Sequence, residues 1–394
     1  MWGSAAVTFV NTIVVGSDGR LSESVTVRGQ RVARVGGAPR RGEVTIDLDG
    51  AFVYPGLVNA HDHLELNSFA RLKWREQHAN VREWIADFQP RFAADPRLAD
   101  ARADTLASRV WVGGLKNLLS GVTTVCHHNP LHRPLWRRFP VRVVRRFGLS
   151  HSLQIDGDRV ASAYRETPPE WPWIIHAAEG IDEEARNEVG TLGCMGCLGP
   201  NSVLVHGVAI DEERAAAVLQ RGGSLVWCPT SNHFLFGRTA RVAPFNRAGR
   251  LAIGSDSRLS GEGDLLDELR AAHGTRQISA ESLCRAVTSS AARMLRQTDA
   301  GGLHAGAHAD LTIVRRIDDD PYESLVRAKR ADVRLTMIDG APLFADTNLE
   351  LTFAARRTTF RRVRVDGSPR LLARWIVARA SSLGVTEPGL EMEA

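Results

Sequence analysis

The sequence predicts an α/β protein, a distorted (β/α)8 barrel of the TIM type with a small β-sandwich domain formed from both ends of the chain. The first observation is that the central part alternates short apolar runs with helical stretches, as parallel βα units do. The second is that both ends consist of short alternating runs separated by Gly, Asp and Arg turns, which is typical of antiparallel strands. A length of 394 residues suits a barrel with one small appended domain.

Eight strands are expected in the central part, and eight βα units close naturally into a barrel. The expected strands cover residues 53–60, 121–127, 141–147, 151–155, 173–177, 202–206, 224–228 and 251–255. Helices are expected at 100–119, 212–220 and 264–273. The units between the second and fifth strands are short, which makes their boundaries the least certain.

The chain ends supply the strands expected for the sandwich. These strands cover residues 8–15, 24–27, 32–35 and 44–46, and later 309–315, 333–339 and 341–344, with a turn at Gly340. The sequence therefore predicts four parts: 1–54 and 305–368 as the two halves of the sandwich, 55–304 as a metal-dependent catalytic barrel, and 369–394 as a helix and tail.

Bulk properties exclude several classes of protein. The net charge of +5 comes almost entirely from arginine, and the arginines are mixed with acidic residues, so nucleic-acid binding is not indicated. Five cysteines without a secretory signal favour a reducing, cytoplasmic compartment. No apolar run approaches the ~18 residues of a membrane helix, so no membrane association is expected.

Candidate metal ligands stand where the expected strands end, which is where the active site of a β/α barrel lies. His61 and His63 end the first strand, and residues two apart in an extended chain project from the same side. His176 ends the fifth strand and Asp256 follows the eighth. Three imidazoles and a carboxylate suit zinc or another divalent ion with room for one water, which the ion would activate.

Two further polar residues stand near the same strand ends. Glu179 follows His176 by three positions, and His206 ends the sixth strand. Neither is needed as a ligand in a four-ligand site. Both are therefore candidates for moving protons.

Several segments together resemble the amidohydrolase superfamily, most closely its cytosine deaminase and triazine hydrolase branch. The segments are PGLVNAHDH at 55–63, HAAE at 176–179, the strand-end His206, SD at 255–256, LSGVTTV at 119–125, CPTSN at 228–232, Gly302-Leu303 with Gly306, and ADL at 309–311. They occur in the order of that family and cover the chain from about residue 32 to 345. The resemblance implies a distorted barrel with a sandwich made from both termini, and one bound zinc or iron ion.

The resemblance also implies roles for single residues. His61, His63 and His176 match the imidazole ligands, and Asp256 matches a carboxylate that is both ligand and base. Glu179 matches the proton shuttle to the substrate ring, and His206 the imidazole that polarises the attacked group. No lysine lies between Lys116 and Lys329, so the bridging carbamylated lysine of binuclear members has no candidate and one metal ion is expected.

The function that the resemblance implies is hydrolytic deamination of an amino-substituted nitrogen heterocycle or cyclic amidine by way of metal-bound hydroxide. One alternative is hydrolysis of another C–N or C–halogen bond, by opening of a cyclic amide or by dehalogenation. A non-catalytic scaffold is a further alternative. It is less favoured because all ligand and proton-transfer positions are filled.

A small-molecule substrate is expected, and six side chains are candidates to bind it. They are Glu65, Asn67, Trp227, Asn232, His233 and Arg258. The loop at 65–88 is rich in charged and aromatic residues, which suggests an anionic or polar aromatic substrate. His127 and His128 either contact the substrate or satisfy backbone groups at the barrel rim, and the second interpretation is favoured. The oligomeric state stays open, with a homo-oligomer as one expectation, since large barrels similar to this one often associate.

Overall fold

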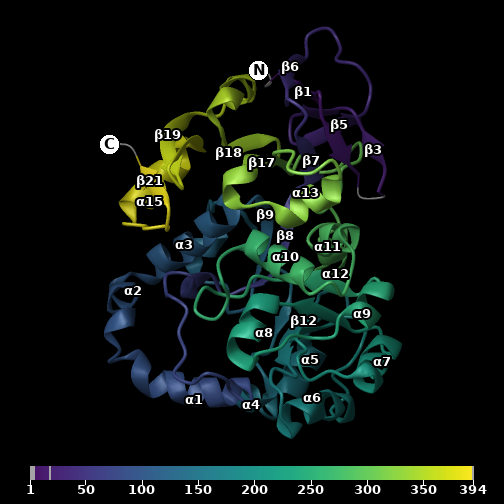
Figure 1. Cartoon of the computed structure of the whole chain (residues 1–394), viewed down its shortest axis with the longest axis vertical. Coiled ribbons are helices and arrows are strands. Elements are labelled where there is room, and N and C mark those ends of the chain that lie inside the picture. Colours follow the sequence, from purple (N-terminus) through teal and green to yellow (C-terminus); the bar gives the residue numbers. More distant parts are fainter. Residues whose placement is uncertain (1–4, 17–18, 393–394) are drawn as a thin grey trace.

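The computed structural model describes residues 5–16 and 19–392, which form an α/β fold (Figure 1). Eight central strands form two parallel sheets in chain order, β10-β9-β8 and β11-β12-β13-β14-β15. The strands are β8 (Leu57–Asp62), β9 (Val122–His127), β10 (Arg142–Val143), β11 (Gly148–Leu149), β12 (Trp173–Ala177), β13 (Ser202–His206), β14 (Ser224–Trp227) and β15 (Leu251–Ile253).

The two parallel sheets meet on one side and are separate on the other. The backbone N–H of Asp256 donates to the carbonyl oxygen of His61 at 3.1 Å, which joins the end of β15 to the end of β8. In the described part of the chain no strand pairing joins β10 to β11. The strands therefore follow the order of an eight-stranded barrel, but their hydrogen bonding does not close the ring.

The prediction of a strand at residues 151–155 is wrong. The fourth strand is β11, which ends at Leu149. The Ser152 hydroxyl accepts a hydrogen bond from the backbone of Ile155 at 3.3 Å and so caps a short helix, α4 (Leu153–Asp156). The apolar run favours a strand, whereas a serine side chain that accepts a backbone N–H favours the start of a helix. At Ser152 the helix forms.

Helices surround the parallel strands, and several begin where a capping side chain accepts a backbone N–H. Thr105, Asp182, Asp211 and Asp264 cap α3 (Leu106–Leu119), α6 (Glu183–Cys194), α7 (Glu212–Gln220) and α10 (Leu265–Gly274). The other helices of this part are α1 (Val81–Phe92), α2 (Ala99–Ala103), α5 (Arg159–Glu166), α8 (Pro229–Phe236), α9 (Ala243–Arg247), α11 (Ala280–Ala286) and α12 (Ser289–Met294).

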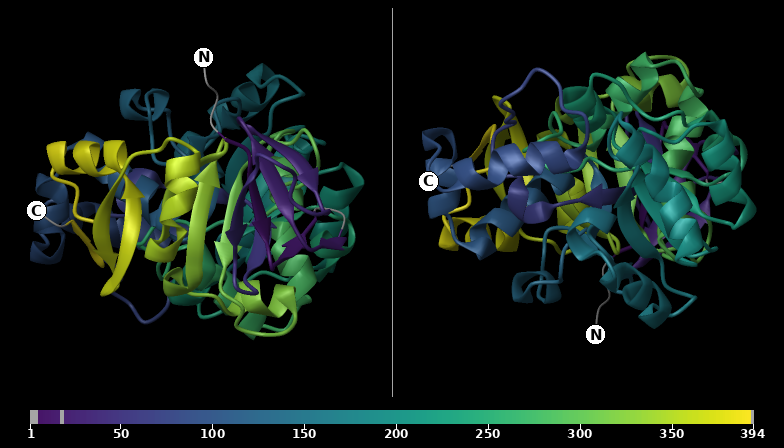
Figure 2. Two further views of the ribbon diagram at one scale, coloured as in Figure 1. Left: turned by 90° about the horizontal axis from the view of Figure 1, so that it is seen from above. Right: turned by 90° about the horizontal axis from the view of Figure 1, so that it is seen from below.

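The chain ends form two further sheets, of strand order β5-β4-β1-β6 and β21-β19-β20-β18-β17-β16-β7-β2-β3. Their strands are β1 (Val7–Val10), β2 (Ile13–Val15), β3 (Leu21–Ser22), β4 (Val25–Arg28), β5 (Arg31–Val35), β6 (Val44–Asp47), β7 (Phe52–Pro55), β16 (Leu311–Val314), β17 (Val333–Ile338), β18 (Ala341–Asp346), β19 (Phe360–Val365), β20 (Ser368–Ala373) and β21 (Leu390–Met392). Both sheets contribute to one apolar cluster that includes Phe9, Val27, Ile313 and Leu335. Figure 2 shows the purple N-terminal strands beside the green C-terminal ones.

Two details of the chain ends differ from expectation. The run expected as one strand at 8–15 is two strands, because Asn11 adopts a left-handed conformation with φ of 50° between them. The segment at 369–392 supplies most of β20 and the edge strand β21 in addition to helix α15 (Arg374–Ser382). Helices α13 (Pro321–Arg327) and α14 (Glu350–Ala355) complete this part. Among the described helices, none combines the length and the apolar character that crossing a membrane requires.

Candidate metal centre

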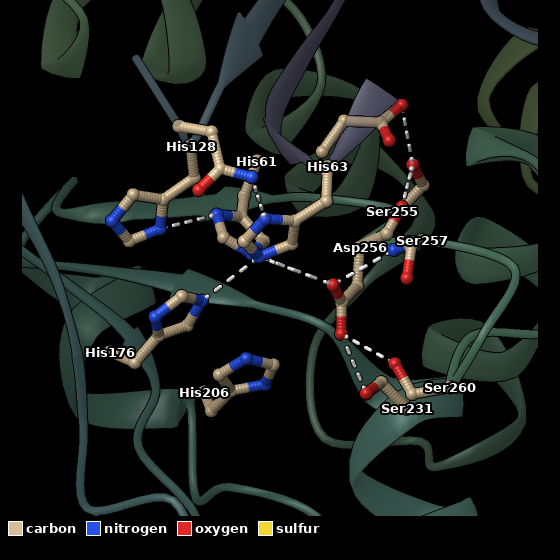
Figure 3. A network of polar contacts seen from close by, with 12 residues as sticks. His61, His63, His128, His176, His206, Ser231, Ser255, Asp256, Ser257 and Ser260 are labelled. Atoms are coloured by element: carbon tan, nitrogen blue, oxygen red, sulfur yellow. Dashed lines mark hydrogen bonds and ion pairs between the residues drawn. The ribbon is translucent and has the colours of Figure 1, made fainter. Parts of the chain in front are cut away.

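The carboxyl ends of β8, β12, β13 and β15 bring four imidazoles and one carboxylate together (Figure 3). Nε2 of His63 lies 3.2 Å from Nε2 of His176. Oδ1 of Asp256 lies 3.7 Å from Nε2 of His61 and 3.8 Å from Nε2 of His63. His206 and Asp256 have left-handed backbone conformations, with φ of 74° and 51°. Backbone strain of this kind is typical of functional sites.

One nitrogen in this cluster has no partner. Nε2 of His61 is buried and makes no hydrogen bond, although a buried polar atom without a partner costs free energy. It faces the Nε2 atoms of the other rings and the carboxylate of Asp256. Three imidazole nitrogens and one carboxylate oxygen are the donors that zinc and similar divalent ions prefer. The residues therefore fit such an ion.

His128, which the sequence analysis assigned to the rim, belongs to this cluster. Its Nε2 lies 3.0 Å from the carbonyl oxygen of Ser150, so that nitrogen carries the proton. Its Nδ1 is then an acceptor for Nδ1–H of His61, 3.2 Å away. The contact fixes the tautomer of His61 and leaves Nε2 of His61 free to bind a metal. His128 comes directly after β9, so its position at a strand end was the signal that could have found it.

His176 is held in a similar way by a backbone group. Its Nδ1 lies 2.7 Å from the carbonyl oxygen of His151 and donates to it. Its Nε2 is thus directed toward His63 and the centre of the cluster. Burial lowers the pKa of His63, His128 and His176 well below the ordinary value, so these rings are neutral, as metal ligands and their hydrogen-bonding partners must be.

Asp256 is held by three hydrogen bonds. The hydroxyls of Ser231 and Ser260 both donate to Oδ2 at 2.8 Å, and the backbone N–H of Ser257 donates to Oδ1 at 2.8 Å. Burial alone would raise the pKa of Asp256, but the nearby imidazoles, His61 first, outweigh burial and hold that pKa well below its usual range. The group is therefore an ionised carboxylate with a fixed orientation.

Glu179 has the opposite electrostatic character. Burial, followed by the charges of Asp256 and Glu188, raises the pKa of Glu179 well above its usual value, so its carboxyl group holds a proton at neutral pH. Its Oε1 lies 3.5 Å from Nε2 of His206. Nδ1 of His206 donates to Oδ1 of Asn232 at 2.9 Å, and burial lowers the pKa of His206 to about 4. His206 is therefore neutral, with Nε2 unprotonated.

A cavity of about 250 Å³ opens at this cluster. One end of the cavity, called the metal end here, is lined by His63, His176, Glu179, His206 and Asp256. Its remaining lining comes from Leu66, Val81, Trp84, Ile85, Phe88, Gln89, Asn129, His151, Ile155, Leu235, Ser257, Leu259 and Ser260. A larger cleft of about 670 Å³ around Arg142 and Arg296 is lined by none of these residues.

The structure does not place the six predicted substrate-binding residues in the lining of this cavity. Arg258 forms an ion pair with Glu387, with 2.7 Å between Nη2 and Oε1. Asn67 donates to Asp62 at 2.8 Å. Both side chains are engaged by partners that lie outside the cavity.

The other four candidates do not line the cavity either, although Glu65 and Asn232 each hold a residue that does. Glu65 accepts a hydrogen bond from Asn129, and His233 is exposed on α8. Trp227 donates to Thr239 at 2.6 Å, and Asn232 acts on the site only through His206.

The cations of the loop at 65–88 face away from the cavity as well. Arg71 donates to the carbonyl oxygens of Ser260 and Gly261, and Lys73 donates to that of Phe234 at 2.7 Å. Arg75 pairs with Asp87 on the outside of α1. The expectation of an anionic substrate therefore has no cation in the lining to support it.

A buried polar network lies behind the ligands. Asp62, between the two histidines of β8, forms an ion pair with Lys116 of α3, with 3.0 Å between Oδ2 and Nζ, and both side chains are fully buried. Lys116 also donates to the Ser255 hydroxyl at 3.0 Å and to the carbonyl oxygen of Asp256 at 3.2 Å. Asn117 donates to Asp62 at 2.7 Å. Lys116 thus links the end of β8 to the end of β15.

Comparison with known proteins gives a consistent result. Residues 171–343 match the amidohydrolase family. A 5-methylthioadenosine/S-adenosylhomocysteine deaminase of Syntrophobacter fumaroxidans is 27% identical over 84% of this chain and 91% of its own length. An 8-oxoguanine deaminase of Pseudomonas aeruginosa is 28% identical over 44% of each chain.

Among solved structures, the zinc complex of atrazine chlorohydrolase from Arthrobacter aurescens has the same fold. It superimposes with a TM-score of 0.69 at 18% identity, over 96% of this chain and 99% of the other. The curated relatives and the family match extend this likeness to the sequence. The chain is therefore similar to members of the amidohydrolase family in sequence, and to a zinc-containing hydrolase in fold.

Proposed function

We propose that the protein is a metal-dependent hydrolase that deaminates an amino-substituted nitrogen heterocycle or a cyclic amidine. The observation that carries the proposal is the position of two buried carboxyl groups in one small cavity, Asp256 beside His61 and His63, and Glu179 beside His206. The pKa of Asp256 is lowered and that of Glu179 is raised. Environments that push two carboxyl pKa values apart assign one group as base and the other as acid. The relatives named above are deaminases, which agrees with this reaction.

His61, His63, His176 and Asp256 would hold one divalent ion, for which we propose zinc, with iron as the alternative. A bound ion of this kind lowers the pKa of water from ~15.7 toward ~7 and so supplies a nucleophile at neutral pH. The ligand set leaves the cavity side of the cluster for water and substrate. The open ring of strands is then the distorted (β/α)8 barrel of the catalytic part, 55–304, and the terminal sheets form the sandwich.

Proton transfers follow from the positions of the carboxyl groups. Glu179 gives its proton to the ring nitrogen next to the attacked carbon, while Asp256 takes a proton from the attacking water. Asp256 then passes that proton to the departing amine as the C–N bond breaks, and Glu179 recovers a proton when the ring carbonyl forms. One water is consumed and one ammonia is released. His206, held neutral by burial and by Asn232, accepts a hydrogen bond at Nε2 and orients the group under attack.

Ammonia release tests this function. The metal-loaded protein is incubated with aminopurines, aminopyrimidines, aminotriazines, aminopterins and cyclic amidines, and ammonia is measured with a coupled enzyme. The proposal expects ammonia and the matching oxo product from at least one class, and no activity with Glu179→Gln. Release of halide from halogenated analogues without ammonia, or no turnover of any compound by protein with one ion per chain, would contradict it.

A further inference from the structure

Helix α1 forms the wall of the cavity that faces the metal end. Trp84, Ile85 and Phe88 lie on one face of α1, because Phe88 follows Trp84 by four residues and Ile85 by three, and residues three and four apart are neighbours on a helix surface. The rings of Trp84 and Phe88 stack with their centroids 5.2 Å apart. Leu235 and Leu259 complete this apolar wall.

The wall offers mainly apolar contact, and Gln89 is the polar side chain that α1 adds to the lining. The indole N–H of Trp84 is already donated to the carbonyl oxygen of Leu72 at 3.1 Å. The Asn129 amide donates to Glu65, and the Ser260 hydroxyl donates to Asp256. These three donors therefore have protein partners, and contact with Trp84, Ile85 and Phe88 depends on apolar surface.

Charge is confined to the metal end. Among the described residues that line the cavity, the charged types are Glu179 and Asp256, both of which belong to the reacting groups. Neither lysine nor arginine contributes to the lining. A carboxylate, phosphate or amino-acid group on the substrate would therefore be placed against the apolar wall without a partner, which costs several kcal/mol.

The cavity is also small. Its volume of about 250 Å³ lies below the ~300–1,000 Å³ typical of sites for drug-sized ligands. A single or fused heterocyclic ring fits such a volume. A ring that carries a ribose and a further side chain would fill this volume and extend beyond Trp84 and Phe88, which are half-buried.

Hydrogen bonds join the start of α1 to the segment that carries Glu179, the proton donor. The backbone N–H of Val81, the first residue of α1, donates to the carbonyl oxygen of Glu179 at 3.0 Å. Asn80 forms a β-bridge with Gly180 and donates through Nδ2 to Asp182 at 2.5 Å. A Cβ at Gly180 would lie 2.7 Å from the carbonyl oxygen of Ala79, so only glycine allows this close approach. The distance between wall and acid is thereby fixed.

We propose, on the basis of the function proposed above, that the substrate is a free, uncharged heterocycle that carries at most a small apolar substituent. The amino-bearing carbon lies at the metal end, the ring nitrogen faces Glu179, and the opposite edge contacts Trp84 and Phe88. Nucleosides, nucleotides and compounds with an amino-acid side chain are excluded by the size and apolarity of the wall. The chain thus differs in specificity from relatives whose names specify adenosine derivatives.

Matched substrate pairs test this inference. For each heterocycle that releases ammonia, kcat/KM is compared between the free base, its alkyl derivative and its nucleoside. We expect the free base or alkyl derivative to exceed the nucleoside by at least ~10-fold, the scale set by pocket fit. Higher kcat/KM for nucleosides would overturn the inference while leaving the deaminase function intact. No ammonia from any member would overturn the deaminase function itself.

Substitutions in α1 test whether its side chains cause the preference for the free base over the nucleoside. Trp84→Ala and Phe88→Ala should raise the ratio of nucleoside to free-base kcat/KM by about 10-fold, with most of the loss for the free base appearing in KM. Phe92→Ala is the matched control, because Phe92 lies on the same helix and packs on both Phe69 and Phe88 but does not itself line the cavity, so it measures the effect of lost helix packing alone. Circular dichroism and metal content verify that each variant is folded. A ratio that changes equally in Phe92→Ala, or in none of the variants, would overturn the assignment of the wall.

Discussion

The two ends of the cavity are constructed differently. At the metal end the side chains come from the ends of four strands, with His61 and His63 both at the end of β8. A second group holds several of them, as His128 holds His61 and three donors hold Asp256. At the apolar end one half-buried helix, α1, supplies most of the wall, and Leu235 and Leu259 complete it. The comparison indicates that the chemistry depends on a rigid set of strand ends. Selectivity between substrates depends mainly on the side chains of α1, which can be substituted without changing the strand ends that hold the metal ligands.

Asp256→Asn should have the largest effect on kcat and should alter only the metal end of the cavity. Loss of the carboxylate removes both a ligand and the base, so kcat should fall by at least ~10³-fold. Steady-state kinetics with the best substrate measure the loss, and the apolar wall should keep binding a substrate analogue. Retention of more than a tenth of wild-type kcat would show that Asp256 is not the base.

Glu179→Gln separates proton donation from binding. The amide keeps the size of the side chain but cannot give a proton, so kcat should fall by about 10²–10⁴-fold while KM changes little. Glu188→Gln is the matched control, since Glu188 is a buried carboxyl with raised pKa that does not line the cavity. Equal losses in the two variants would contradict the role of Glu179.

Lys116→Met tests the support behind the ligands. The substitution leaves Asp62 buried without its cation, which should lower the free energy of unfolding by about 3–5 kcal/mol. Urea unfolding followed by circular dichroism measures the change. The double variant Asp62→Asn with Lys116→Met should recover part of the stability, whereas additive losses would show that the ion pair is not the cause.

His128→Phe should have the smallest effect of these four. The ring volume is retained but His61 loses the partner that fixes its tautomer, so the affinity for zinc should fall by about 10–100-fold. Competition with a chelator of known affinity measures it. His127→Phe, one residue earlier, is the comparison variant, and an equal loss there would show that the effect comes from general disturbance of the end of β9.

The sequence was most informative about the metal end. His61, His63, His176, His206, Glu179 and Asp256 were predicted from strand ends and motif order, and the structure brings their side chains together. Strand ends are predictable because apolar runs mark the strands and parallel strands share one edge. His128 had the same signal, but the sequence left open whether it contacts the substrate or satisfies backbone groups at the rim.

The sequence did not show which side chains of the loop at 65–88 form the apolar wall, for a physical reason. Whether a loop side chain faces the cavity depends on partners that lie far away along the chain. Arg258 turns toward Glu387 of the C-terminal segment, and Glu65 turns toward Asn129. Charged residues in the loop at 65–88 suggested a polar pocket, yet the structure directs their charges outward and Trp84 and Phe88 inward.

Metal content tests the central claim most directly. The purified protein is loaded with zinc, freed of excess ion and examined by elemental analysis beside His61→Ala, with His233→Ala as the control on the exposed surface of α8. The account predicts one ion per chain in the wild type and in His233→Ala, and less than a tenth of that in His61→Ala. An absence of tightly bound metal in the wild type, or equal metal content in His61→Ala, would contradict it.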